Sequence, residues 1–208
     1  MVRKRTIALG VVGGVIAGFG AAKLYQRAAT ETVPYTVVAR LDDVELRRYP
    51  ESVVVETVAD SRPAAFRRLF KYITGENAGT TEIEMTAPVE LSANGATISM
   101  TAPVEIGGED GSRMRFYLPA EYDIESAPRP TEDSVELLEI PERTVAVRRF
   151  SWRPTEARID SETEALLDKL EAANVPLAGE PFFMGYDAPW TLPFLRRNEV
   201  AVEVESSF

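Results

Sequence analysis

The chain has 208 residues and a formal net charge of −10, and it contains neither cysteine nor histidine. Disulfides and thiolate chemistry are therefore excluded, and the commonest general base and haem or metal ligand is missing. Five of the 23 basic residues precede Glu31, so from Glu31 onward 18 basic residues face 33 acidic ones. Such a surface excludes nucleic acid as the expected partner, and its few lysines favour a halophilic source, where salt screens the repulsion between like charges.

The N-terminus is basic and is followed by an uncharged stretch, residues 6–22. One interpretation is a retained membrane anchor, in which Gly10, Gly14 and Gly18 form a close-packing stripe on a transmembrane helix. The other is a cleaved signal peptide ending near Gly20-Ala21-Ala22. Basic residues stay on the cytoplasmic side. We therefore expect residues 1–30 to be an anchor or signal segment with a tether. Residues 31–208 then form a domain outside the cytoplasm, either anchored to the membrane or secreted.

The first part of the body predicts three strands and a helix. Alternating apolar residues indicate strands at Tyr35–Arg40, Val44–Tyr49 and Ser52–Val58. A helix is expected from Pro63 to about Thr74, because apolar residues recur there at helical spacing and Gly75 follows.

A six-residue phrase then occurs twice, Met85–Glu90 and Met100–Glu105, on either side of Asn94-Gly95. Asn-Gly is the strongest short signal for a two-residue hairpin turn. We therefore predict a hairpin in which Val89 pairs with Met100 and Leu91 with Ile98. Pro88 and Pro103 would then face its outer edges.

The second part of the body predicts further strands and a helix from about Thr155 to Ala173. The strands are expected at Arg113–Leu118, Val135–Ile140, Thr144–Phe150, Phe182–Tyr186 and Val200–Val204.

An internal sequence repeat with an offset of 91 residues relates the two parts of the body to each other. From Val44 to Pro63, eight of twenty ungapped positions are identical in the second copy, and both copies predict strand, strand and helix. The repeat indicates an α+β fold of two pseudo-symmetric halves, with helices packed on a mostly antiparallel sheet or barrel. A cleft near the pseudo-axis would be a natural ligand site.

From about Tyr35 to Val204 the sequence resembles the SOUL/haem-binding protein family. The residues that carry the resemblance are Val44–Tyr49, Phe66–Asn77, the two Met-Thr-Ala-Pro-Val phrases, Met114–Pro119 and Tyr186–Val200. The resemblance implies a distorted, mostly antiparallel β-barrel of two pseudo-repeated halves flanked by two helices. It also implies non-covalent binding of haem or another tetrapyrrole in an apolar groove.

The chain departs from the family where a histidine would ligate iron. The groove would then hold the macrocycle by apolar contact and its propionates by cations. Met85, Met100, Met114 and Tyr72 are weak ligands, and packing in the core is the favoured interpretation of methionines at strand spacing. No metal ligand and no catalytic residue is therefore assigned.

The candidate ligand-binding residues lie on the first helix and near the C-terminus. Those of the helix are Phe66, Arg67, Arg68, Phe70, Lys71 and Tyr72, and those near the C-terminus are Trp190, Arg196 and Arg197. For the helix cations, a solvated face or ion pairs with nearby glutamates is the favoured alternative. For the C-terminal block, the alternative is a structural plug.

The leading hypothesis is a tetrapyrrole-binding module that serves as a carrier, buffer or sensor. The alternative is a protein-interaction or effector-sensing domain for which haem is not the physiological ligand. An enzyme is not expected. The carboxylates available for acid–base chemistry are Glu82, Glu84, Glu90 and Glu105, and on the predicted strands all four point to solvent.

Overall fold

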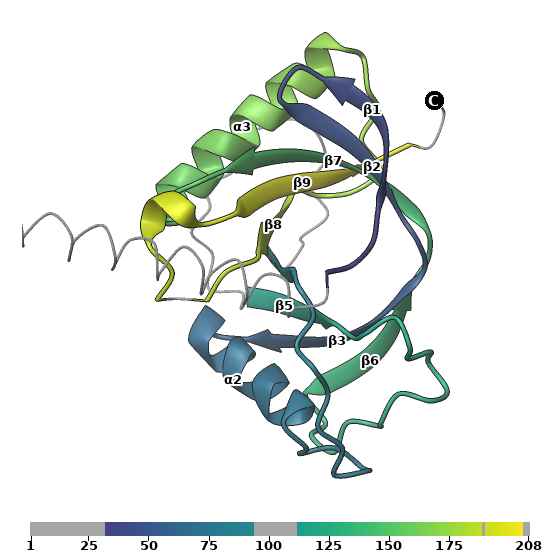
Figure 1. Cartoon of the computed structure of the whole chain (residues 1–208). Helices are drawn as coiled ribbons and strands as arrows, with labels where there is room; N and C mark the ends of the chain where they lie inside the picture. Colours follow the sequence, from purple (N-terminus) through teal and green to yellow (C-terminus); the bar gives the residue numbers. More distant parts are fainter. Residues whose placement is uncertain (1–31, 94–111, 189, 206–208) are drawn as a thin grey trace, which may run out of the picture. The chain divides into compact units, whose positions relative to one another are not determined.

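A computed structural model describes residues 32–93, 112–188 and 190–205 (Figure 1). The helices are α2 (Arg62–Ile73) and α3 (Glu156–Ala172), with a 3-10 turn η1 (Pro193–Leu195). The strands are β1 (Thr36–Leu41), β2 (Val44–Tyr49), β3 (Ser52–Ala59), β4 (Val89–Ala93), β5 (Ser112–Tyr117), β6 (Val135–Ile140), β7 (Arg143–Phe150), β8 (Phe182–Gly185) and β9 (Asn198–Val204).

The strands form one sheet in the order β1-β2-β7-β9-β8-β4-β5-β3-β6, and each pairing is antiparallel. The mostly antiparallel α+β prediction is confirmed. The closed barrel is wrong, because β1 and β6 are the two ends of this order and do not pair with each other within the described residues. The predicted N-terminal hydrophobic helix lies outside those residues. No helix in the described part of the chain has the length and apolar character needed to cross a membrane.

The repeat sets the order of the strands. An offset of 91 residues places β2 on β6 and β3 on β7, with the same first and last positions. The pairing of β2 with β7 then becomes the pairing of β6 with β3: Val44 opposite Arg148 corresponds to Val135 opposite Thr57. Each half therefore completes the sheet of the other, and the pseudo-axis lies between β8 and β4.

The outer face of the sheet carries both helices. Figure 1 shows α3 above β7 and β9, and α2 below β3. One apolar cluster joins Leu69 and Ile73 of α2 to Val55 and Phe116, and a second joins Leu166 and Leu170 of α3 to Leu46 and Val202. Burial of these side chains fixes the helices, because each contributes about 1.5–3 kcal/mol when removed from water.

The inner face of the sheet lies between its two halves. Its apolar cluster takes residues from both, including Val54 and Tyr117 from one half and Val147 and Phe182 from the other. Val33, just before β1, packs in the same cluster, and its N–H donates to the carbonyl of Ala87. The inner face therefore forms a third core.

The predicted hairpin register is wrong. β4 begins only at Val89, and both its edges are occupied, so that Leu91 lies opposite Met114 of β5 on one side and Phe183 of β8 on the other. Ile98 therefore cannot be the cross-strand partner of Leu91. β5 alternates apolar and polar residues as β4 does, so a distant strand with matching faces replaces the local partner. The Asn94-Gly95 turn and the second copy of the phrase lie outside the described residues.

Candidate functional site

The first candidate site is an aromatic and basic surface on α2. Ser61 caps this helix by accepting a hydrogen bond from the N–H of Ala64, and Pro63 lies in its first turn. Phe66 and Phe70, one helical turn apart, are 38% and 45% exposed, and their ring centroids are 5.8 Å apart at an interplanar angle of 16°. Phe66 also packs edge-on against Phe116 at 5.3 Å. Two nearly parallel rings therefore remain open to solvent.

The cations of α2 differ in how they are engaged. Lys71 forms an exposed ion pair with Glu76 at 3.2 Å. Arg68 donates to the carbonyl of Val58 and lies 3.5 Å from Glu132. Arg67 is exposed and makes no ion pair within the described residues. The expected alternative of pairing with nearby glutamates thus holds for Lys71, and Arg67 is an exposed cation on the helix that carries the two rings.

Tyr72 belongs to the core under α2. It is 2% exposed, and its hydroxyl donates to the carbonyl of Pro128 at 2.7 Å. Burial, together with the charge of Tyr122, raises the pKa of Tyr72 to about 12. The structure therefore does not bring Tyr72 to the surface that holds Phe66 and Phe70. Met114 is buried and Met85 half-buried against the same core, as the methionine pattern predicted, and Met100 lies outside the described residues.

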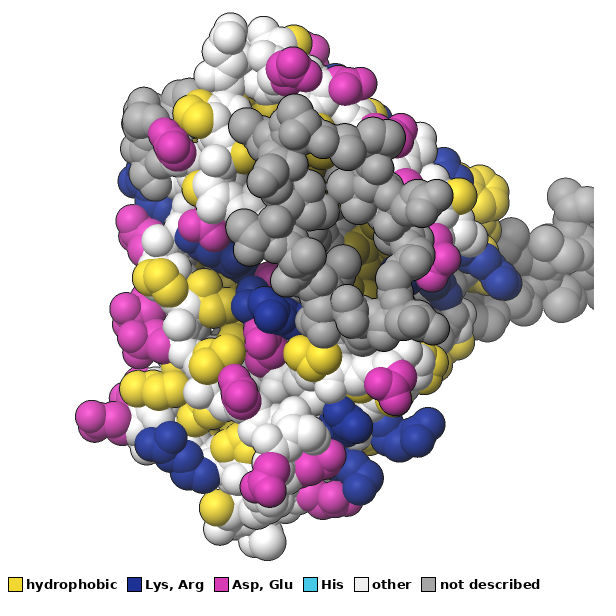
Figure 2. Space-filling model, turned by 180° about the vertical axis from the view of Figure 1, so that it is seen from behind, with side chains coloured by type: hydrophobic (Ala, Val, Ile, Leu, Met, Phe, Trp, Pro, Cys, Tyr) yellow, Lys and Arg dark blue, Asp and Glu magenta, His cyan; other side chains and the backbone are white. Residues whose placement is uncertain are grey.

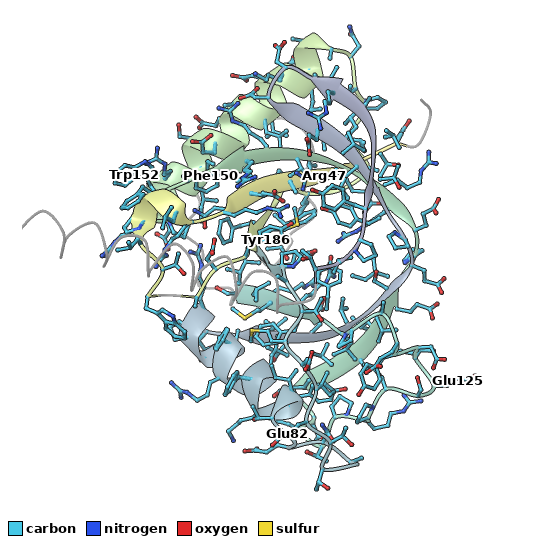
Figure 3. The ribbon with its side chains drawn as sticks, in the orientation of Figure 1. Arg47, Glu82, Glu125, Phe150, Trp152 and Tyr186 are labelled. Carbon is cyan, nitrogen blue, oxygen red and sulfur yellow. The ribbon has the colours of Figure 1, made fainter. Side chains whose placement is uncertain are left out.

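The second candidate site surrounds η1. Trp190 is 78% exposed, and Leu192 and Phe194 follow it on the surface. Trp152, which the sequence did not single out, lies against this segment with its ring 6.5 Å from that of Phe194. Figure 3 shows Trp152 at the outer edge of the fold. Its only sequence signal was an aromatic residue between a strand end and Pro154.

The two C-terminal arginines have structural partners. Arg196 donates from Nε to the carbonyl of Thr191 at 3.0 Å and so braces the loop. Arg197 donates to Glu199, and its backbone N–H donates to the carboxylate of Asp187. Its guanidinium also lies over the ring of Tyr186 at 3.8 Å. Arg197 therefore belongs to the inner face, where Glu199 and Tyr186 contact its guanidinium.

A third feature is a buried ionic network around Glu199. The carboxylate accepts hydrogen bonds from Arg47 at 2.8 Å, from the Tyr186 hydroxyl at 2.8 Å and from Arg197 at 2.9 Å, and it is 0% exposed. Figure 3 shows Arg47 and Tyr186 in the interior. Burial, followed by the charge of Glu199, raises the pKa of Tyr186 well above its usual value. Burial alone would lower the pKa of Arg47, but Glu199 raises it.

A matching network surrounds Glu90, which is 2% exposed and not solvated as predicted. It accepts hydrogen bonds of 2.8 Å from Arg115, Tyr117 and Arg143. Arg115 also donates to Glu56. Burial, and then the charge of Glu90, raises the pKa of Tyr117. Glu82 and Glu84 are exposed, as predicted, and Glu105 lies outside the described residues.

In both networks arginine and tyrosine side chains donate to the buried carboxylate. Each buried carboxylate already has several donors, and no group of three or more carboxylates within the described part is placed to hold a metal ion. On the face shown in Figure 2, acidic and basic side chains are interspersed. A depression lined by Arg68, Lys71 and Tyr72, together with Glu132, has a volume of about 20 Å³. This is below the roughly 300–1,000 Å³ of pockets for small-molecule ligands.

Comparisons with known proteins place the fold. The chain is similar to the crystal structure of the EcmrR C-terminal domain, with 15% identity, a TM-score of 0.54, and 82% of this chain and 98% of that chain covered. It is similar to the cryo-EM structure of an EcmrR–DNA complex (11% identity, TM-score 0.56, 95% and 69% covered). It also resembles the crystal structure of a hydrolase from Listeria innocua (10% identity, TM-score 0.51, 88% and 98% covered). At these identities the likeness concerns the fold alone.

The sequence comparisons give the family. No curated protein matches the chain. The family model described as SOUL heme-binding protein matches residues 30–203, which include the whole sheet except its last residue, both helices and η1. The chain therefore belongs to the SOUL haem-binding family.

Proposed function

We propose that the chain binds haem or a related tetrapyrrole on the aromatic and basic surface of α2, without a histidine ligand, as a carrier, buffer or sensor. The observation that carries the proposal is the exposed pair of nearly parallel rings of Phe66 and Phe70, with Arg67 in the sequence between them. Stacking on aromatic rings contributes about 0.5–1.5 kcal/mol beyond the buried area. Arg67 and Lys71 are the cations that would grip the carboxylates of the ligand.

The residues present fit the macrocycle and its carboxylates better than they fit the iron. The chain has no histidine or cysteine, Met114 and Tyr72 are buried, and Met85 packs against the core. Binding would therefore depend on the flat apolar face of the ligand. The depression of about 20 Å³ beside α2 does not enclose a porphyrin, so the ligand would lie on an open surface.

The experiment compares haem with metal-free protoporphyrin on the full chain. Haem is followed by its Soret band and protoporphyrin by its fluorescence. Because no side chain ligates the metal, the two ligands should bind with affinities within about threefold of each other. Phe66→Ser and Phe70→Ser should each weaken the binding of both ligands. Val38→Ser, which removes a 39% exposed side chain on β1, should leave the binding of both unchanged. Tight haem binding without protoporphyrin binding would contradict the proposal.

The small depression favours a second candidate, a protein-interaction or effector-sensing domain for which haem is not the ligand. A partner should then co-purify with the chain, and neither haem nor protoporphyrin should give a spectral change or raise the unfolding temperature. A spectral change that saturates at one ligand per chain would exclude this candidate.

We also propose that residues 6–22 anchor the chain in a membrane, with the domain outside the cytoplasm. The support is the uncharged stretch that follows Arg3, Lys4 and Arg5. N-terminal sequencing of the protein purified from membranes distinguishes an anchor, which retains Met1 or Val2, from a signal peptide cleaved near Ala22.

A further inference from the structure

We propose that the surface around η1 docks the domain on a lipid bilayer. This docking surface consists of Trp152, Trp190, Leu192 and Phe194, which are exposed by between 42% and 78%. It comes from two segments, the end of β7 and the chain between β8 and β9. The inference does not depend on tetrapyrrole binding by α2.

Both tryptophans of the chain lie on this docking surface. Tryptophan is highly buried on average in folded proteins, so two exposed tryptophans on one surface need an explanation. An indole ring has an apolar body and one N–H donor, and tryptophan is enriched where one end of a side chain contacts hydrocarbon and the other contacts water. Lipid headgroups and the acyl chains beneath them provide both.

The docking surface is held outward by its own backbone. Trp152 has a φ of 80°, in the left-handed region that a bulky residue rarely adopts. Its N–H donates to the carbonyl of Pro193, and its carbonyl accepts from the Asn198 side chain. Arg196 bonds to the carbonyl of Thr191 and braces the same loop. An uncommon backbone conformation that keeps a tryptophan exposed points to a function for that side chain.

Charge around the docking surface favours lipid phosphates. Residues 188–198 contain no acidic side chain in a chain with 33 of them, and Arg153 and Arg196 lie in the two segments. Basic side chains near a bilayer are attracted to anionic headgroups. A chain that carries the uncharged stretch 6–22 would also stay close to the bilayer, because residues 23–31 span at most about 30 Å.

Tryptophan fluorescence tests the proposal, because residues 1–31 contain no tryptophan. The full chain is purified in detergent and reconstituted into vesicles of phosphatidylcholine mixed with an anionic phospholipid, with or without bromine on the acyl chains. Bromine quenches an indole only at close range. We expect tryptophan emission to be lost in brominated vesicles and to be retained in vesicles without bromine. A domain that is merely anchored would keep both tryptophans in water, unquenched by bromine and accessible to aqueous acrylamide, and that result would overturn the proposal.

Variants that keep both tryptophans sharpen the test. Leu192→Ser and Phe194→Ser should each reduce the quenching by brominated lipid, with a loss of about fivefold to tenfold in the docking equilibrium. Leu177→Ser is the matched control, since Leu177 is 41% exposed and Leu192 is 42% exposed. Brominated lipid should quench the tryptophan emission of this variant as strongly as that of the unaltered chain. Unchanged circular dichroism confirms that each variant folds. Equal quenching in Leu192→Ser and Leu177→Ser would contradict docking through this surface.

Discussion

Arg143 on β7 donates a hydrogen bond of 2.8 Å to the Glu90 carboxylate on β4, although β9 and β8 separate these strands in the sheet. The bond therefore crosses the inner face and joins the two halves of the repeat. The barrel expected from the sequence is not closed by strand pairing. Instead, side chains on the inner face connect the halves, with Arg143 also donating to Tyr117 at 2.6 Å.

Replacing Glu90 should destabilise the fold strongly. Glu90→Gln removes the charge that Arg143 and Arg115 face, and breaking a buried ion pair on one side costs about 3–5 kcal/mol. Glu142→Gln is the control, because Glu142 lies 4.0 Å from Arg48 with both side chains exposed, and exposed pairs contribute at most about 1 kcal/mol. Urea unfolding of the variants measures the difference. Equal free energies of unfolding would show that the crossing network does not hold the halves together.

The buried tyrosines predict a loss of stability at high pH. Burial raises the pKa of Tyr49, Tyr72, Tyr117 and Tyr186 above the ordinary 10.0, to about 12 for Tyr72. A raised pKa means that the folded state favours the neutral phenol, so its contribution is complete below about pH 10 and is lost as the pH rises through the folded pKa.

A spectrophotometric titration checks this prediction. Of the seven tyrosines in the chain, these four should form tyrosinate only as the protein unfolds, so a second step in tyrosinate absorbance should coincide with loss of circular dichroism. Ionisation of all seven near pH 10 with the fold intact would contradict it.

The strands were predictable because apolar and polar residues alternate locally along them, and the repeat was predictable because identical residues recur at a fixed offset. The predicted Val44–Tyr49 and Val135–Ile140 are the observed β2 and β6, and each helix begins and ends within one residue of the prediction. The alternation places Val44 and Leu46 on one face of β2, and that face packs under α3. It could not reveal strand order, since β4 finds β5 and β8 instead of the nearest partner.

The prediction for the inner face was wrong at Glu90, which was assigned to solvent but is buried, and other inner-face residues share its pattern. In Val44–Tyr49 the polar positions Glu45 and Arg47 alternate with apolar ones, and such residues usually meet water. Here they face the other half of the sheet, and Arg47 is buried against Glu199. Burial of a charged strand residue depends on a partner 152 residues away. Phe66 and Phe70, which are four residues apart, lie on one helix as predicted.

Trp152 should tolerate glycine better than alanine. A left-handed conformation costs a residue with a Cβ about 1–2 kcal/mol, and glycine avoids this cost. Trp152→Gly should therefore be more stable than Trp152→Ala by about 1 kcal/mol. At Arg153, which lies outside the left-handed region, glycine should be no more stable than alanine. Thermal unfolding of the four variants gives the comparison, and a preference for alanine at position 152 would show that the positive φ is unstrained.

The cations of α2 predict a dependence on the ligand's carboxylates. Arg67→Ala combined with Lys71→Ala should weaken the binding of protoporphyrin by about thirtyfold, because each lost charge-assisted hydrogen bond contributes roughly 1 kcal/mol at an exposed site. Protoporphyrin dimethyl ester, which has no carboxylate charge, should bind both proteins equally. Arg158→Ala combined with Lys169→Ala on α3 is the control, since those cations pair with Glu162 and Asp43. Equal weakening of acid and ester would show that the cations act on folding.

Substitutions on the two aromatic surfaces should affect different binding properties. Trp190→Ser removes the most exposed side chain of the docking surface and should lower vesicle association about tenfold, while protoporphyrin affinity stays within about twofold. Phe70→Ser should do the reverse, because the ring stacked on Phe66 lies on α2 and not beside η1. Flotation of the reconstituted domain and fluorescence titration with protoporphyrin measure the two properties on the same samples. Should Trp190→Ser weaken the porphyrin as much as Phe70→Ser does, the tryptophan would belong to the tetrapyrrole site, as the sequence first suggested, and the division into two surfaces would be wrong.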